Sequence, residues 1–491
     1  MRNKKIILAL PIFAMLVGLT ACDIGSNNGN GSYVDITPVY NDNLLTGSGK
    51  ITVWVGNESV EFYQNVADDW VDVNAALSPD FHFTVEVAGH DTGSVAGDLI
   101  NDASACADIY TAAHDNIGKL AAGKYAKPFY DGYIYDQIIA DNPTSFTNVC
   151  YSVVDGKRAL YGSPYIGQSL FLMYNKQYVT AEQAQTFEGL KAAAAAISTP
   201  TKKVNAVTVT GTDGYNYSFN LLAQNNETHA TSLKLYEGGN KATGSCWAQG
   251  EDAVANLRWA QRYFDEENGL AWASSSGWEQ DVSNTGTLAL ISGSWKYNAF
   301  ANAVGVSNVG VAMIPTYTLT SADVEGTTAE VGTVMRGGTF ADCKVFMING
   351  YSNGTKYLAE QNLIKYLSTK TVQKDSFVQC DNLPAYNGAA TDIADLYSAG
   401  SITESSYNMA VAQNDMFAYG IPQPFVSGTF NTYYYSKGAP ALYQLVIENK
   451  SDAYATTDSL RQVLYRMQYI WQKGQEPASV PSTLPATIES K

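Results

Sequence analysis

The sequence has few charged residues and no excess of basic ones. Charged residues make up 16% of the chain of 491 residues, and 30 Lys and Arg stand against 47 Asp and Glu, which gives a formal net charge of -17. Proteins that bind nucleic acid or anionic lipid headgroups through their surface carry a basic patch, and the composition offers no such excess. Nucleic acid is therefore excluded as the ligand.

Cysteine is scarce and lacks the spacing of a metal site. Six cysteines are present, and the five that follow the N-terminal segment contain no C-x-x-C pair: Cys106, Cys150, Cys246, Cys343 and Cys380. At most two disulfides can form among five thiols, so one thiol stays free. The four histidines are scattered, and no Cys/His cluster has ligand spacing. We expect no metal, no cofactor, and cysteines that act mostly as small buried apolar residues.

Signatures of catalysis are also missing. The chain has no G-x-S-x-G, H-E-x-x-H or G-x-G-x-x-G motif. The segment from Gly47 to Lys50 resembles the end of a phosphate loop, but Leu44 replaces the first glycine and Ile51 follows the lysine, so we interpret it as a linker. An enzyme would have to rely on carboxylates, for example Glu58 and Asp115 as a glycosidase acid and base. Any acidic protein offers such pairs.

Aromatic residues are abundant. The chain contains 33 Tyr, 17 Phe and 8 Trp. Tyrosine combines a stacking face with a hydroxyl that forms hydrogen bonds, a combination suited to sugars. The composition therefore favours a carbohydrate ligand.

The N-terminus has the features of an export signal. Basic residues between Arg2 and Lys5 precede an apolar run that ends at Leu19, and Leu19-Thr20-Ala21-Cys22 resembles a bacterial lipobox. We expect residues 1–21 to be a lipoprotein signal peptide and Cys22 to be lipidated; the alternative is an ordinary cleavage site of a secreted protein. Residues 22–49, rich in Asn, Gly and Ser, predict a flexible tether. No later run reaches the roughly 18 apolar residues of a spanning helix.

The body of the chain alternates predicted strands and helices. Thr180 and Gln183 form a capping-box pattern before an Ala-rich helix, an apolar helical spacing runs over 254–264 and ends by Gly269, and an apolar stripe over 460–471 ends at Gly474. Short β-branched runs predict strands over 51–55, 83–87, 171–174, 207–209, 288–291 and 345–348. This alternation predicts α/β layers with mainly parallel sheets, in which ligands lie at the carboxyl ends of strands or between domains.

An ordered set of short motifs carries a resemblance to a known family. The set comprises the lipobox, the strand 51–55 followed by Gly56-Asn57-Glu58, Ala113-His114-Asp115, Pro164 to Lys176, Gly293-Ser294-Trp295 and Ile421-Pro422-Gln423. Together these segments resemble the extracellular solute-binding lipoproteins of sugar ABC transporters (family 1), and are closest to maltose/maltodextrin-binding proteins. The resemblance covers roughly residues 50 to 474.

The resemblance implies a two-lobed α/β fold of the periplasmic-binding-protein type (type II), with hinge strands between the lobes and a ligand cleft between them. Lobe one would comprise 50–166 with 343–390, and lobe two 167–342 with 391–491. The implied function is capture of malto-oligosaccharides by hinge closure and delivery to ABC permease subunits in the membrane. The protein would be a monomer without enzymatic activity, extracytoplasmic, and attached to the bacterial cell membrane through Cys22.

The resemblance also implies site residues in lobe one and at the hinge. Glu58 matches a carboxylate that accepts hydrogen bonds from sugar hydroxyls; a helix N-terminal cap is the alternative role. Asp115 matches the ligand-binding aspartate of the Ala-His-Asp turn, and Asn116 stands where some members have Arg or an aromatic residue. His114 is expected to be structural. Gln168 occupies a hinge position where relatives have Glu, and either binds sugar or satisfies the hinge.

The aromatic residues of the implied site come from lobe two. Trp295 aligns with a cleft tryptophan, and Tyr215 and Tyr217 fall near a segment with a sugar-stacking tyrosine, Tyr217 being the better match. Beyond Gln423 the family places another stacking aromatic, for which Phe430 is our first choice and Tyr433 our second. Relatives also have a basic group shortly afterwards that has no counterpart we can place.

Three alternatives remain open at this point. The ligand could be a different oligosaccharide, the protein could be a secreted carbohydrate-active enzyme that uses Glu58 and Asp115, or it could be a lipoprotein that signals through a membrane sensor instead of feeding a transporter.

Overall fold

The larger sheet of lobe one is built around a parallel core of three strands. The computed structural model describes residues 33–209, 215–216, 218–228, 236–237, 241–242, 245–264, 277–423, 456–473 and 475–488. In this sheet, β2 (Gly47–Val55) pairs in parallel with both β3 (Phe81–Gly89) and β4 (Ile109–Ala113). β19 (Asp342–Asn349) runs antiparallel to β4, β5 (Ala126–Lys127) and β8 (Ser163–Gln168). Residues at alternate positions of β2 are fully buried, as the period of two requires.

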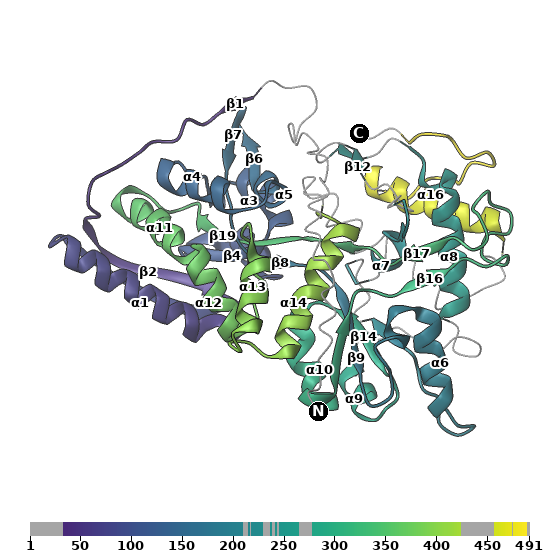
Figure 1. Ribbon diagram of the computed structural model, residues 1–491. Helices are drawn as coiled ribbons and strands as arrows, with labels where there is room; N and C mark the ends of the chain where they lie inside the picture. The colour runs from purple at the N-terminus through teal and green to yellow at the C-terminus, as the bar shows by residue number, and fades with distance from the viewer. Residues whose placement is uncertain are drawn as a thin grey trace, which may run out of the picture.

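Helices cover this sheet and complete the core of lobe one (Figure 1). α1 (Val60–Leu77) packs against β3, and α11 (Gly354–Leu367) contacts β2 and α1. A hydrophobic core made by residues between 51 and 166 and between 343 and 385 joins these layers. The lobe also contains α2 (Val95–Asp102), α3 (Ile117–Ala122), α4 (Gly132–Asp141), α5 (Thr144–Val149) and α12 (Lys370–Cys380), with a small sheet of β1 (Val34–Asp35), β6 (Tyr151–Val154) and β7 (Lys157–Leu160).

Lobe two contains a mixed sheet in the order β10-β14-β9-β15. β10 (Thr208–Val209) and β14 (Ala289–Ser292) are parallel, whereas β9 (Phe171–Asn175) is antiparallel to β14 and β15 (Val309–Ala312). The expectation of mainly parallel sheets is therefore wrong for this lobe, and the antiparallel pairs of β19 make the larger sheet of lobe one mixed as well. The physical reason lies in the hinge: β9 starts there, and β14 ends there, because Ser292 pairs with Phe171.

A second hydrophobic core fills lobe two, with contributions from residues between 170 and 340 and from 409 onwards. Its strands and helices lie in the other half of the molecule in Figure 1. The helices are α6 (Phe187–Ile197), α7 (Ser218–Leu221), α8 (Glu251–Tyr263), α9 (Trp278–Ser283), α10 (Tyr297–Val304), α14 (Glu404–Met416) and α16 (Thr457–Lys473). Short strands β11 (Gln224–Asn225), β16 (Thr316–Thr318) and β17 (Val334–Arg336) form a further sheet, and β12 (Tyr236–Glu237) pairs with β13 (Lys241–Ala242).

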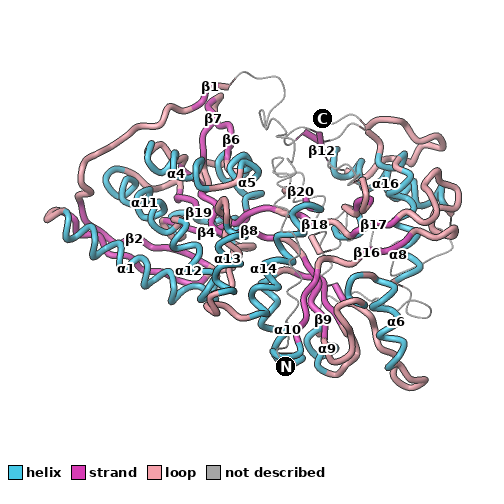
Figure 2. The backbone as a smooth tube through the Cα atoms, in the orientation of Figure 1, coloured by secondary structure: helices cyan, strands magenta, loops and turns pink. Residues whose placement is uncertain are grey.

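Three segments of the described residues link the lobes. β8 of lobe one continues into β9 of lobe two through Ser169 and Leu170, and β18 (Thr339–Phe340) continues into β19 through Ala341. The third segment is α14 followed by β20 (Gly420–Ile421), which pairs in parallel with β18 between the lobes (Figure 2). A small third core joins α12 to α13 (Ala389–Ser398) and α14 beside this junction.

Local sequence patterns are realised with small shifts. All six predicted strands are present. The capping box forms, because the Thr180 N–H donates to Gln183 and the Gln183 N–H donates to the Thr180 hydroxyl. It caps a single 3-10 turn, however, and α6 begins later with Thr186 as its N-cap.

The N-terminal segment from residue 33 lies on lobe one. β1 pairs with β7, the Val39 N–H donates to Tyr130 O over 2.7 Å, and the Gly132 N–H donates to Val39 O over 2.8 Å. The predicted linker at 47–50 is the beginning of β2, where Gly47 and Gly49 adopt positive φ. The expectation of a flexible tether is therefore wrong for residues 33–49; Cys22 and the signal segment lie outside the described residues.

Candidate ligand-binding site

Three connections between a strand and a helix, called corners below, have the same form. Each strand ends in a 3-10 turn that leads into a helix: β2 into Asn57–Ser59, β4 into His114–Asn116 and β14 into Ser294–Lys296. The middle residues of the three turns are Glu58, Asp115 and Trp295, all predicted to bind the ligand. In α/β sheets, ligands bind outside the carboxyl ends of strands, which is where the turns place these side chains.

Glycine shapes two of the three corners. A Cβ at Gly56 would overlap the Glu58 carboxylate, and a Cβ at Gly293 would overlap the six-membered ring of Trp295. Each functional side chain therefore lies back over the glycine two residues before it. The motifs Gly-x-Glu and Gly-x-Trp consequently determine side-chain orientation as well as the turn.

The lobe-one corners present two carboxylates. Glu58 is exposed, and the N-cap of α1 is Ser59, so the alternative role of Glu58 as that cap is not realised. Asp115 is half-buried and accepts a hydrogen bond of 3.0 Å from the Asn116 amide, which also donates to Ala113 O. Asn116 thus orients the Asp115 carboxylate while remaining buried itself.

The lobe-two corner presents aromatic rings. Trp295 is 42% exposed although it is a large apolar side chain. Its ring centroid lies 6.0 Å from that of Tyr215, which in turn lies 5.8 Å from that of the buried Phe340. The predicted residues Tyr217, Phe430 and Tyr433 lie outside the described residues.

Both sets of corners border the hinge. In lobe one, Ala113, directly before the turn with Asp115, pairs with Lys344 near the hinge end of β19. In lobe two, Ser292, before the turn with Trp295, pairs with the first residue of β9. Carboxylates in lobe one and the exposed ring of Trp295 in lobe two can form the polar and stacking halves of a sugar site.

Gln168 takes part in a hydrogen bond of the hinge. Its Nε2 donates to Asp342 Oδ1 over 2.5 Å, and both side chains are buried. Gln168 was predicted either to bind sugar or to form hydrogen bonds within the hinge. The bond to Asp342 supports the role in the hinge. His114 is fully buried, and its Nε2 lies 2.8 Å from Gln423 O, as expected for a structural residue.

Sequence reasoning missed Lys344. Burial lowers the pKa of this lysine, while the carboxylates of Glu58, Asp91 and Asp342 act in the opposite direction. Its ammonium group thus lies within electrostatic range of Glu58 at a lobe-one corner and of Asp342 at the hinge. The available signal was a lysine directly before the apolar run 345–348, between Cys343 and Val345.

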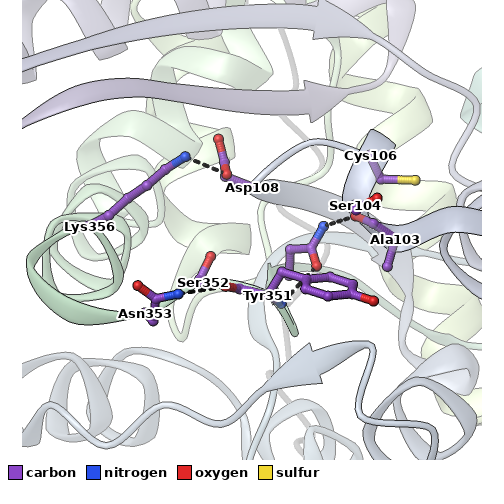
Figure 3. A pocket seen from close by; sticks show the side chains of 9 residues that line it. Ala103, Ser104, Cys106, Asp108, Tyr351, Ser352, Asn353 and Lys356 are labelled. Carbon is purple, nitrogen blue, oxygen red and sulfur yellow. Dashed lines mark hydrogen bonds and ion pairs between the residues drawn. The ribbon is translucent and has the colours of Figure 1, made fainter.

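A cavity of about 300 Å³ lies at the other end of the lobe-one strands, away from the turns with Glu58 and Asp115 (Figure 3). It borders the residue before β4 and the last residue of β19, and Lys356 Nζ forms an ion pair of 2.6 Å with Asp108 there. None of the predicted site residues lines it. Its lining residues are Ala103, Ser104, Cys106, Asp108, Asn349, Tyr351, Ser352, Asn353 and Lys356.

Two kinds of feature are absent from the part of the chain that the structure describes. The described residues contain no group of His, Cys, Asp or Glu that could hold a metal ion. Within the same ranges, no helix combines the length and the apolar character needed to cross a membrane. The five cysteines of the described part are free thiols, and three of them are buried.

The fold and these corners define a two-lobed solute-binding protein. The model of the bacterial extracellular solute-binding protein family matches residues 74–439, so the chain belongs to that family and is extracytoplasmic. A maltotriose-binding protein of Pyrococcus abyssi is 26% identical over 147 residues, 30% of each chain. A maltooligosaccharide ABC transporter solute-binding lipoprotein of Streptococcus pneumoniae is 24% identical over 225 residues, 44% of this chain and 49% of the relative. The matches thus span less than half of these curated relatives.

Solved structures share the fold over most of the chain. The maltodextrin-binding protein MalE1 of L. casei, without ligand, has a TM-score of 0.61 at 17% identity, with 86% of this chain and 100% of that chain covered. The GacH receptor of Streptomyces glaucescens has a TM-score of 0.63 at 18% identity, with 87% and 99% covered. The predicted two-lobed fold of the periplasmic-binding-protein type is confirmed.

Proposed function

We propose that this protein is the substrate-binding lipoprotein of an ABC importer, and that it captures malto-oligosaccharides by hinge closure and delivers them to a membrane permease. Binding is the whole mechanism, without chemistry on the sugar. The observation that carries the proposal is that three strand-to-helix turns, two in lobe one and one in lobe two, have Glu58, Asp115 and Trp295 at their middle positions. The strands before Asp115 and Trp295 pair with β19 and β9 next to the hinge.

The chemistry of these groups suits a pyranose. Carboxylates accept charge-assisted hydrogen bonds from sugar hydroxyls, and an aromatic face covers the apolar C–H patch of the ring. Trp295 offers such a face because it is 42% exposed, and Tyr215 stands beside it. The ligand favours the closed state only through contacts with both lobes, so acceptors in lobe one and rings in lobe two together supply the driving force.

Lobe limits of 50–166 with 343–390 and 167–342 with 391–491 form part of this proposal. The two hydrophobic cores support limits near these positions. Lipid attachment at Cys22 is also part of the proposal. The lipobox supports it, as does the description of the Streptococcus pneumoniae relative as a lipoprotein. Because the segment from residue 33 contacts lobe one, only residues 22–32 would separate the lipid from the folded body.

Calorimetry tests the proposal. The chain lacking residues 1–22 is titrated with maltotriose, maltohexaose, cello-oligosaccharides and xylo-oligosaccharides, and release of reducing sugar is followed in parallel. A single-site signal for the α-glucans without hydrolysis is the expected result. Binding of another sugar alone would refute the malto-oligosaccharide assignment but keep the receptor, whereas sustained hydrolysis would refute the receptor itself.

A further inference from the structure

One buried carboxylate contacts all the segments that link the lobes. Asp342 begins β19 on the second link, its Oδ1 accepts from Gln168 on the first link over 2.5 Å, and its Oδ2 accepts from the Gln423 amide, beyond β20 on the third, over 2.8 Å. Two nearby backbone N–H groups also donate across these segments: Ala341 N–H to the backbone Ile421 O, and Leu170 N–H to the side-chain hydroxyl of Thr339.

The burial of this carboxylate makes its partners important. Asp342 is 0% exposed, and Gln168 and Gln423 are 6% and 5% exposed. A buried charge is tolerated only when hydrogen bonds replace the water it has lost, and bonds from amide N–H groups to a carboxylate are stronger than neutral ones. Any opening of the hinge that separates two of these segments would leave the charge partly unpaired.

The same carboxylate also reaches the turn that carries Asp115. His114 Nδ1 lies 3.6 Å from Asp342 Oδ2, and His114 Nε2 lies 2.8 Å from Gln423 O. His114 is the first residue of the turn His114–Asn116 and precedes Asp115 directly in the sequence. The imidazole therefore connects the turn to two of the three linking segments.

We propose that Asp342 is a positioning residue of the hinge, which holds the three linking segments in register and, through His114, couples ligand binding at Asp115 to closure. The coupling part rests on the proposed sugar-binding function; the holding part does not. Because the hinge is ordered before ligand arrives, closure costs less ordering of these segments, and affinity rises accordingly.

Asp342→Asn is the informative variant, since the amide keeps the shape but replaces one acceptor by a donor that faces donors. Asp323→Asn is the matched control: Asp323 is also 0% exposed and bonded, to Arg262 and Thr320, but within lobe two. Hydrogen exchange of the ligand-free full chain is followed by mass spectrometry in peptides that cover 163–171, 338–343 and 418–423. We expect exchange about tenfold faster in these hinge peptides for Asp342→Asn, and an effect confined to the region around 320–333 for the control.

Maltotriose binding followed by stopped-flow tryptophan fluorescence supplies the second arm. We expect Asp342→Asn to weaken binding about tenfold, mainly through faster dissociation, with little change for Asp323→Asn. If the wild type binds no maltotriose, the proposed ligand is wrong, while the exchange arm still decides whether Asp342 holds the hinge. Hinge exchange equal to wild type, or equally fast throughout the chain, would overturn the inference. Should Asp342→Asn not fold, Gln423→Met removes the side-chain amide that donates to Asp342 and leaves the carboxylate in place. Its hinge peptides should exchange about threefold faster, and unchanged exchange would overturn the inference equally.

Discussion

Glu360 lies in the interior of lobe one, and we predict that replacing it by glutamine removes a pH-dependent loss of stability. The residue is on α11 and is 0% exposed, and neither carboxyl oxygen has a hydrogen-bond partner. Burial raises the pKa of Glu360 from its ordinary value of 4.5 to about 8, despite the nearby Lys356 and Lys127. The native state therefore holds a proton at pH 7 that the unfolded chain releases.

The sign and size follow from this difference in proton binding. Between pH 4.5 and 8 the native state binds more protons than the unfolded state, so this group makes the free energy of unfolding fall as pH rises. From pH 5 to pH 7 the loss is about 2.5 kcal/mol, and it levels off above pH 8. Glu360→Gln should escape it, and its stability relative to wild type should improve by that amount over the same interval.

Urea denaturation followed by circular dichroism at pH 5, 6, 7 and 8 measures the effect. Any packing cost of the amide is the same at every pH, so the change of the difference with pH carries the test. Glu61→Gln is the matched control, because Glu61 is an exposed glutamate on α1 of the same lobe. A difference between Glu360→Gln and wild type that stays constant from pH 5 to 8 would refute the reasoning, since the carboxyl would then be charged in the native state.

Three further predictions concern sugar binding and are measured by calorimetry with maltotriose. Trp295→Ala should weaken binding about tenfold or more through loss of the stacking face. The control is Tyr351→Ala, which removes another exposed aromatic side chain, beside the cavity at the other end of the lobe-one strands, and should leave binding unchanged. Gly293→Ala should weaken binding although no binding group is removed, because its Cβ displaces the Trp295 ring; wild-type affinity would show that the ring position is unimportant. Lys344→Met should weaken binding about tenfold through loss of a charged donor. The wild type should lose affinity as pH rises toward the lowered pKa of this lysine, whereas the affinity of Lys344→Met should not change in this way.

Much of the fold could be predicted from the sequence because it depends on local patterns. Alternating apolar residues at 51–55 and the β-branched run at 345–348 predict strands, and a period of two needs no knowledge of the partner strand. The same holds at the corners. A glycine two residues before Glu58 and before Trp295 leaves room for each side chain within one turn, so the local geometry depends on a short segment. The resemblance of these short segments to family motifs is what singled out the two residues.

Other features depended on contacts between residues far apart in sequence. The sequence around residues 33–46 does not indicate that this Asn-containing segment lies on lobe one. Its hydrogen-bond partners, such as Tyr130 and Asp136, come about a hundred residues later. The direction of β9 against β14 was likewise decided by the hinge and not by either strand, and the sequence therefore predicted parallel pairing wrongly.

The sequence by itself predicted the alternation of strands and helices and the positions of the strands, since these follow from local periodicity. Its resemblance to a known family implied the two lobes and the turns with Glu58, Asp115 and Trp295. Only the tertiary structure decided that Gln168 bonds to Asp342, 174 residues away, that Lys344 lies among carboxylates, and that Glu360 is buried without partners. The physical reason is that hydrogen bonding and desolvation depend on which surfaces meet when the chain folds, and a polar residue in the sequence carries no mark of its partner.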